Sequence, residues 1–306
     1  MTTRSPDAGQ HPHRIRSLLF APGNSARKLH RVTDFGADAV DLDLEDAVPV
    51  TEKLEARRMV GEALREFKEH QDDKTPLIVV RVNGPDSGLM DGDLGVAVQA
   101  GVFAIHLTKL RSAGDIEACD RIVTKLEVKR HLSAGSIRFI SSVDSAALAL
   151  RLEQMAAASS RLYCFVLGGV DFADDLGVGY SESMSESLWV RSYGVLVSRA
   201  AGMAPPLHPP VTNFKDLDHL QRVMAAGRQL GFQGGVAIHP AQVSVLHQVF
   251  KPSAEEERWA KAVVAGFSQA LADGTAAVDV GGELVDYAMV RRAEQILKAA
   301  PGDDSR

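Results

Sequence analysis

Short apolar runs alternate with helix-like segments six times in the first 178 residues of the chain. Each apolar run is short enough for a buried strand, and each helix-like segment has apolar residues at helical spacing. The apolar runs are 17–21, 39–44, 77–83, 103–107, 137–143 and 162–167, and the helix-like segments between them are 25–35, 51–68, 91–100, 112–130 and 145–159. This alternation predicts a parallel sheet with helices outside it, either a doubly wound sheet or a (β/α)8 barrel.

The second half of the chain favours the barrel. Residues 188–202 predict a helix and 234–238 a strand, whereas 204–210 contains four prolines where a seventh strand would fall. Proline cannot donate to a sheet, so we expect that strand to be short or irregular. Eight units end near residue 251, close to the roughly 250 residues that a TIM barrel usually needs. We therefore predict an α/β protein with a (β/α)8 TIM barrel over residues 16–251.

Two segments fall outside the predicted barrel. Residues 1–15 are polar, with prolines and histidines, and we expect a disordered tail. Residues 252–306 contain helix-like segments at 254–272 and 287–299, separated by glycine-rich turns, and we predict a helical lid and oligomerisation extension. Four apolar residues of the first of these helices recur at helical spacing and predict a face that another subunit covers. They are Trp259, Val263, Val264 and Phe267.

Composition narrows the function classes. The net charge of −6 and the pI near 5.9 provide no basic face, which argues against a nucleic-acid partner. No apolar run is long enough to span a bilayer, so we expect no membrane partner. Cys119 and Cys164 lie in helix-like or strand-like segments. We expect them to be small core residues of a protein in a reducing compartment, rather than a disulfide or a metal-binding pair. The first fifteen residues do not resemble a signal peptide, and a cytoplasmic protein is expected.

Polar residues follow the predicted strands, and strand ends share one rim of a barrel, where active sites lie. They are Glu45, Asp46, Arg81, Asn83, Lys109, Asp144 and Asp171. Magnesium is usually held by one or two carboxylates with waters and substrate oxygens, which suits Asp144 and Asp171. Zinc is less expected, because no histidine or cysteine stands at these positions. The alternatives are that both aspartates cap helices, and that Lys109 merely pairs with Asp144.

This set of residues also indicates a type of chemistry. Magnesium with two substrate oxygens bound is typical of a 2-oxo acid chelated through its carboxylate and ketone, with the metal as Lewis acid. Arg81 would then hold a second oxyanion such as an enolate. Together these features predict that the protein makes or breaks an aldol or Claisen carbon–carbon bond.

Motifs along the whole chain resemble those of the citrate lyase beta-subunit family, part of the HpcH/HpaI aldolase superfamily. They are Arg16–Asn24, Gly36–Val48, Arg81–Asn83, Leu230–Phe232, Ala237–Gln242 and Phe250–Ser253. The resemblance covers residues 16–298. It implies a (β/α)8 barrel, magnesium and often an acyl-CoA substrate, as in malyl-CoA and citramalyl-CoA lyases.

The resemblance also implies roles for single residues. Arg81 matches the active-site arginine and Asp171 a metal-binding aspartate. Asp144 stands where the family usually has a glutamate, one methylene longer, as the second metal ligand. Their place at strand ends, rather than the resemblance, leads us to expect that Glu45, Asp46 and Lys109 support this rim. The residues implied at the nucleotide end of a coenzyme A site are Pro22, Gly23, Asn24 and Arg27. Arg27 and Lys28 would pair with phosphates; the alternative is that they are solvated charges on a helix surface.

Asp286 matches an aspartate that, in relatives, lies on a C-terminal lid over a neighbouring subunit's active site and carries a proton. The resemblance thus implies a homotrimer or hexamer. The alternative for Asp286 is an N-cap of the following helix. Other positions depart from the family: Leu207 or His208 stands where relatives have an aspartate, and Gly235 where they have a lysine. Leu148 replaces a glycine and is expected to narrow the mouth of the site.

We therefore expect a magnesium-dependent lyase that cleaves a 3-hydroxyacyl-CoA, similar to malyl-CoA or citramalyl-CoA, to an acyl-CoA and a 2-oxo acid. Three alternatives remain open at this point. The first is an aldolase on a free hydroxy acid without coenzyme A. The second is a thioesterase on the same thioesters. The third is a non-catalytic relative that keeps the barrel and binds a ligand.

Overall fold

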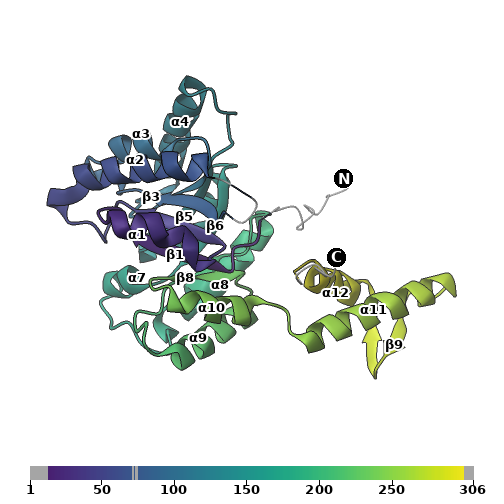
Figure 1. The fold of residues 1–306 in the computed structure, drawn as a ribbon. Coiled ribbons are helices and arrows are strands. Elements are labelled where there is room, and N and C mark those ends of the chain that lie inside the picture. Colours follow the sequence, from purple (N-terminus) through teal and green to yellow (C-terminus); the bar gives the residue numbers. More distant parts are fainter. Residues whose placement is uncertain (1–12, 71, 73–74, 300–306) are drawn as a thin grey trace. The chain divides into compact units, whose positions relative to one another are not determined.

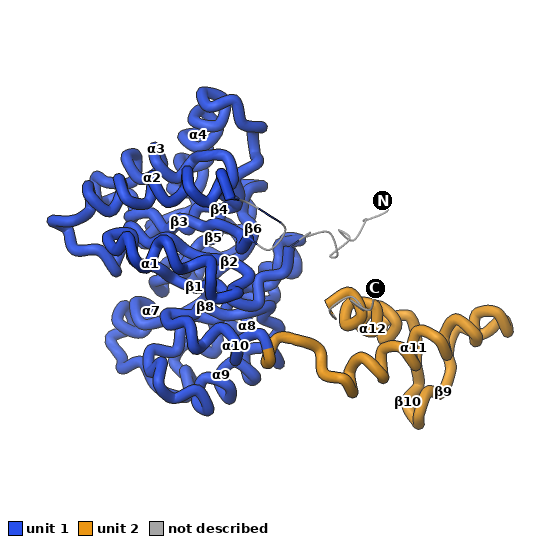
Figure 2. Tube along the Cα trace, in the orientation of Figure 1, with its two compact units in different colours: residues 1–247 blue, residues 248–306 orange. Residues whose placement is uncertain are grey.

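The computed structural model describes residues 13–70, 72 and 75–299 (Figure 1). The predicted tail lies outside the described residues over positions 1–12, whereas Ile15 is already fully buried in the core. The chain forms two compact units, residues 1–247 and 248–306, shown in different colours in Figure 2. The division falls within helix α10 (Ala241–Phe250).

Eight parallel strands of the first unit close into a barrel in sequence order, with β1 paired to both β2 and β8. The prediction of a (β/α)8 barrel is therefore confirmed. The two-residue β7 agrees with the short strand expected from the flanking prolines. The strands are β1 (Ser17–Pro22), β2 (Ala39–Asp43), β3 (Leu77–Arg81), β4 (Val102–Leu107), β5 (Arg138–Val143), β6 (Leu162–Leu167), β7 (Leu207–His208) and β8 (Gly234–Ala237).

The helices that connect the strands lie outside the barrel (Figure 1). Local sequence sets their ends: Ser112 and Asp115 form a capping box at the start of α4, and Asp216 caps α9. The helices are α1 (Ala26–Arg31), α2 (Lys53–Glu69), α3 (Met90–Ala97), α4 (Ala113–Lys129), α5 (Ala146–Ala149), α6 (Leu152–Ala157), α7 (Val170–Asp175), α8 (Leu188–Ala200) and α9 (Leu217–Leu230). Short 3-10 helices occupy Val32–Phe35, Val50–Glu52, Pro85–Ser87 and Ser185–Ser187.

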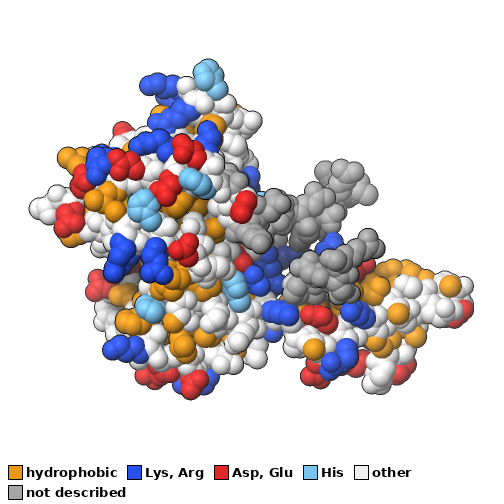
Figure 3. Space-filling view, in the orientation of Figure 1, with side chains coloured by type: hydrophobic (Ala, Val, Ile, Leu, Met, Phe, Trp, Pro, Cys, Tyr) orange, Lys and Arg blue, Asp and Glu red, His pale blue; other side chains and the backbone are white. Residues whose placement is uncertain are grey.

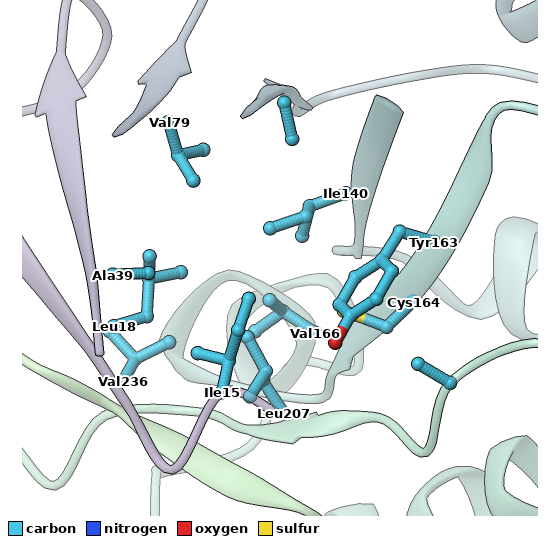
Figure 4. Close-up of a cluster of buried hydrophobic side chains, with 12 residues drawn as sticks. Ile15, Leu18, Ala39, Val79, Ile140, Tyr163, Cys164, Val166, Leu207 and Val236 are labelled. Atoms are coloured by element: carbon cyan, nitrogen blue, oxygen red, sulfur yellow. The ribbon is translucent and has the colours of Figure 1, made fainter. Parts of the chain in front are cut away.

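The barrel interior is layered. Its apolar layer contains one buried residue or more from each strand, and Figure 4 draws these side chains as sticks. Ala39, Val79, Ala104 and Ile140 belong to this layer. Because side chains alternate along a strand, the residues two positions further on face the interior as well. Those positions hold Asp41, Arg81, His106 and Ser142, so a polar layer lies above the apolar one, towards the strand ends.

The second unit has a core of its own. Helix α11 (Ala254–Ala272) packs against α12 (Tyr287–Ala299) and a hairpin of β9 (Val278–Val280) and β10 (Glu283–Val285). Val263 and Phe267 are buried in this core, and Trp259 and Val264 pack against it. The expectation that these four residues need another subunit to cover them is therefore wrong. The partner of this face is α12, about thirty residues later in the same chain.

Two surface properties bear on possible partners. Acidic and basic side chains are interspersed over the visible face of the first unit in Figure 3, in keeping with the net charge of −6. Among the described residues, no helix combines the length and hydropathy needed to cross a lipid bilayer.

Candidate active site

A cavity of about 760 Å³ opens at the ends of the barrel strands, where TIM-barrel enzymes carry their active sites. Its lining includes four of the polar strand-end residues named from the sequence, Asp46, Arg81, Asp144 and Asp171. The structure therefore brings together in one cavity residues from the ends of β2, β3, β5 and β6. Gly168 and Gly169, between β6 and α7, also line it.

Arg81 is held by two carboxylates. Its Nε and Nη2 donate to the two oxygens of Asp43, at 2.8 Å and 2.6 Å, and its Nη1 lies 3.1 Å from Oε2 of Glu45. Burial alone would lower the pKa of Arg81, but the Asp43 hydrogen bonds and charge raise it above the usual value. The guanidinium is thus a fixed cation in the wall of the cavity, preorganised for an anionic oxygen.

Lys109 ties the rim together. Its Nζ lies 2.7 Å from Glu45 and 2.6 Å from Asp46, and its backbone N–H donates to Oδ2 of Asp144 at 3.0 Å. Burial raises the pKa of Glu45, opposed by Arg81. The backbone of Lys109 has φ 50°, a left-handed conformation that is uncommon for residues other than glycine. The supporting role expected for Glu45, Asp46 and Lys109 is consistent with this network. Among the described residues, the ion pairs of the Lys109 side chain are with Glu45 and Asp46 rather than with Asp144, as the alternative would require.

Asp144 and Asp171 form the second part of the site. Burial raises the pKa of Asp144, the Lys109 backbone hydrogen bond opposes this, and the negative charge of Asp171 raises it further. Two carboxylates that repel each other across a cavity are a donor set that fits a hard divalent cation. No group of three or more potential ligands occurs among the described residues, so such a cation would complete its shell with water and substrate oxygens.

The four residues expected at a coenzyme A site lie in different surroundings. Pro22 and Arg27 line the cavity, together with the basic Lys28 and Arg31 of α1. Gly23 and Asn24 are not part of the described lining. A Cβ on Gly23 would lie 2.6 Å from the carbonyl oxygen of Asp43, so this glycine permits close packing on β2. Asn24 donates to Glu52 instead.

Asp286 belongs to the second unit. Its Oδ1 accepts backbone hydrogen bonds from Ala288 and Met289 at 2.8 Å and 3.2 Å, which is the geometry of an N-cap for α12. The capping alternative raised from the sequence is therefore present in the structure. Both of these cap hydrogen bonds go to Oδ1, so the cap does not use Oδ2 of the carboxylate.

Three positions where the chain departs from the family are buried. His208 is fully enclosed: its Nε2 lies 3.1 Å from Nη1 of Arg191, and its Nδ1 donates to the Pro209 carbonyl. Gly235 has no room for a side chain, since a Cβ would lie 2.8 Å from Sδ of Met224. Leu148 of α5 is only 1% exposed and does not belong to the described cavity lining, so it does not narrow the mouth as expected.

Sequence reasoning missed the polar layer below the rim. Asp43, Asp41, His106 and Ser142 sit inside strands that were interpreted as apolar runs. A signal was present: Asp41 and Asp43 are two apart, which places both on the face of β2 that carries Ala39. A charged residue on the interior face of a buried strand requires a partner, and Arg81 and His106 are those partners.

The model of the family described as HpcH/HpaI aldolase/citrate lyase matches residues 16–240. The chain belongs to this family. It is similar to the citrate lyase subunit beta of Haemophilus influenzae, with 32% identity over 93% of this chain and 96% of the relative. It is equally similar to the (3S)-malyl-CoA thioesterase of Cereibacter sphaeroides strain ATCC 17023, with 32% identity over 94% and 95%.

A solved structure extends the likeness to the fold. It is the protein CitE from Mycobacterium tuberculosis in complex with magnesium, acetoacetate and coenzyme A, with a TM-score of 0.74 and 25% identity. The similarity covers 94% of this chain and 98% of that structure. The resemblance inferred from the motifs is confirmed, and so is the expectation of an enzyme of a carbon–carbon lyase family.

Proposed function

We propose that this family member is a magnesium-dependent lyase that cleaves a 3-hydroxyacyl-CoA, similar to malyl-CoA or citramalyl-CoA, to an acyl-CoA and a 2-oxo acid. The observation that carries the proposal is the meeting of Arg81, Asp144 and Asp171 in one cavity whose edge holds the basic residues of α1. A fixed guanidinium and a pair of carboxylates are the groups that a carbon–carbon cleavage through an enolate requires.

Asp144 and Asp171 would hold the magnesium, which supplies Lewis-acid polarisation of a carbonyl oxygen when bound. The CitE structure with magnesium, acetoacetate and coenzyme A, from a protein 25% identical to this chain, supports both the metal and the thioester. Arg81 would bind the enolate oxygen of the acyl fragment. Its link to Asp43 fixes the guanidinium plane, so little reorganisation is needed when negative charge develops.

Arg27, Lys28 and Arg31 would bind the phosphates of coenzyme A. Arg27 and Lys28 are exposed, and all three line the cavity from one helix, so a nucleotide at this edge meets three cations. Pro22 would line the coenzyme A site beside these three cations. Gly23 and Asn24 would shape the loop before α1, Gly23 by packing closely on β2 and Asn24 by its hydrogen bond to Glu52.

Asp286 would carry the proton that the acyl carbon gains or loses, from a lid formed by residues 252–306 of a neighbouring subunit. Neither Arg81 nor the metal can carry that proton, and general acid–base help contributes about 10²–10⁴-fold. This part of the proposal requires a homo-oligomer, a trimer or hexamer. Gly281 and Gly282 form the turn of the β9–β10 hairpin, whereas Gly274 lies between α11 and β9 with positive φ, which suits a hinge position.

The test is a screen of 3-hydroxyacyl-CoA thioesters and of the matching free hydroxy acids, with magnesium and with a chelator. We expect release of an acyl-CoA and a 2-oxo acid from a thioester only when magnesium is present. Cleavage of the free acid alone would replace the proposal by an aldolase without coenzyme A. Binding of thioesters with no turnover in any condition would leave a non-catalytic relative.

Hydrolysis is the second candidate function, favoured by the 32% identity to a (3S)-malyl-CoA thioesterase. The same screen separates it, because hydrolysis releases free coenzyme A and an intact hydroxy acid, whereas the lyase reaction releases an acyl-CoA and a 2-oxo acid.

A further inference from the structure

A hydrogen-bonded chain of three side chains, Asp41, His106 and Ser142, lies in the polar layer of the barrel and takes no part in the roles proposed above. Nδ1 of His106 is 2.7 Å from Oδ2 of Asp41, and Nε2 is 2.9 Å from Oγ of Ser142. His106 and Ser142 line the cavity, whereas Asp41 is fully buried and does not belong to its described lining. Ser142 is thus the member at the cavity end of this hydrogen-bonded series, and Asp41 is the member at the buried end.

The chemistry of the three groups fixes the direction of the hydrogen bonds. An ionised carboxylate only accepts, so Nδ1 of His106 carries a proton and donates it to Asp41. In the neutral ring Nε2 is then an acceptor, and it receives the hydroxyl proton of Ser142. This order is that of an activated nucleophile: hydroxyl, then base, then the group that orients the base.

The buried carboxylate is incompletely satisfied. Oδ1 of Asp41 has no hydrogen-bond partner among the described residues, and the described hydrogen bond of this side chain is the one to His106. A polar network with a purely structural role would be expected to satisfy both oxygens. The Asp41 carboxylate beside the ring instead stabilises the imidazolium that forms when His106 takes a proton.

The surroundings of His106 suit acyl transfer. Arg81 is its cross-strand partner in the β3–β4 register and lines the same cavity. The Phe20 ring packs edge-on against His106, with centroids 6.0 Å apart, and lies 4.8 Å from the Arg81 guanidinium carbon. A cation able to hold an oxyanion therefore lines the same cavity as Ser142, and an apolar ring packs against both this cation and the base.

We propose that Ser142 is a nucleophile that hydrolyses acyl thioesters through an acyl-serine, with His106 as general base and Asp41 as a positioning residue. The Ser142 oxygen forms a bond to the thioester carbonyl carbon and its proton passes to Nε2 of His106. The C–S bond breaks and the thiolate leaves with that proton. One water, deprotonated by His106, then releases the carboxylic acid and restores Ser142. Only the identity of the substrate as a coenzyme A thioester rests on the proposed function.

A fluorophosphonate probe tests the nucleophile directly, because it reacts with activated serines by losing fluoride and forming an Oγ–P bond. We expect full-length protein to be labelled at Ser142, located by peptide mass spectrometry. Ser142→Ala removes the label. The matched control is Ser141→Ala, since Ser141 is the neighbouring buried serine of β5, outside the described cavity lining, and its hydroxyl donates to the Ser142 carbonyl.

Variants of the other two residues separate catalysis from structure. His106→Gln lowers the labelling rate by about 10²–10⁴-fold, the usual contribution of a general base. Asp41→Asn lowers the maximal labelling rate constant and leaves the half-saturating probe concentration unchanged. As a rescue, Ser142→Cys is alkylated by iodoacetamide faster than the same variant with His106→Gln. Thermal melts check that each variant folds.

Absence of a label on Ser142 in the wild-type protein, beside a fully labelled serine hydrolase, overturns the proposal and leaves the three residues as a structural network. Labelling unaffected by His106→Gln does the same. The probe is applied with and without a chelator, and labelling is expected in both cases. The lyase function is tested by the separate thioester screen, in which turnover depends on magnesium. A failure of the lyase proposal and a failure of the serine proposal are therefore seen in different experiments.

Discussion

One guanidinium fork joins β3 to β2: Nε and Nη2 of Arg81 donate to the two oxygens of Asp43, at 2.8 Å and 2.6 Å. The two residues are also direct partners in the strand register, so the backbone and the side chains enforce the same alignment. The positive charge of the cavity wall is therefore set in place by the fold itself. A lysine ammonium is a point charge and cannot hold two oxygens in this way.

Arg81→Lys is expected to lower kcat/KM for the thioester by about 10²–10³-fold, the usual loss when one oxyanion donor is removed. Steady-state kinetics on the substrate found by the screen measure it. The matched control is Arg57→Lys, because Arg57 holds the buried Asp93 at 2.8 Å outside the described cavity lining. Arg57→Lys should cost stability and keep kcat/KM; near-normal turnover in Arg81→Lys would remove Arg81 from the chemistry.

Asp171→Ala is expected to weaken magnesium binding strongly, because it removes one of the two carboxylates that face each other in the cavity. Isothermal calorimetry with magnesium alone measures the affinity. Asp174→Ala is the control, since Asp174 is an exposed aspartate of the same helix, α7, and does not belong to the described lining. Equal affinity of Asp171→Ala and wild type would show that the metal binds elsewhere.

Asp286→Asn is expected to abolish most turnover while α12 stays folded. Asparagine caps helices as well as aspartate does, so the two hydrogen bonds from Ala288 and Met289 are kept and only the proton-carrying carboxylate is lost. Kinetics together with the helical signal in circular dichroism measure both effects. If the helix is intact and turnover is unchanged, Asp286 is a cap and has no part in the reaction.

Mixing Asp286→Asn with Asp171→Ala subunits tests whether the lid acts on a neighbouring subunit. We expect each variant alone to lack turnover, whereas a mixed oligomer would contain sites with an intact Asp171 and a partner's intact Asp286. We expect partial recovery of activity after subunit exchange, which differently tagged subunits verify. No recovery despite exchange would refute action across subunits. A monomeric mass of the wild-type protein, measured by light scattering, would refute it independently.

The parts of the fold that follow from local pattern were predictable. Each barrel strand and most helices have a hydrophobic period that is visible within one segment. The prolines around β7 likewise predicted that this strand would be short. The helix expected at 145–159 instead divides into α5 and α6, with Leu150 and Arg151 between them. Helix α9 was missed, although Leu220, Met224 and Gly227 recur at helical spacing on its buried face.

The site was predictable only along single strands. Strand ends converge on one rim whatever the register, which is why Arg81, Asp144 and Asp171 were grouped correctly in one cavity. The pairings Asp43–Arg81 and Asp41–His106 depend on register between strands far apart in sequence, which no local pattern encodes. The covering of the apolar face of α11 by α12 is a tertiary contact of the same kind.

His208 predicts how stability depends on pH. It is fully buried in β7, and burial lowers its pKa to about 4, with the Pro209 hydrogen bond opposing and the Arg191 charge lowering it further. An unfolded histidine titrates near 6.5. Between these values the unfolded chain binds a proton that the folded chain excludes, so the free energy of unfolding falls as the pH falls.

From pH 7 to pH 4 this group is expected to cost about 3 kcal/mol of stability, the free energy that corresponds to its pKa shift. Chemical denaturation at several pH values measures the slope. His208→Gln keeps an acceptor for Arg191 but does not titrate, so its slope should be shallower between pH 6.5 and 4, whatever its absolute stability. His70→Gln, an exposed histidine at the end of α2, should keep the wild-type slope. Parallel slopes for wild type and His208→Gln would mean that His208 takes up its proton in the folded state as readily as in the unfolded chain.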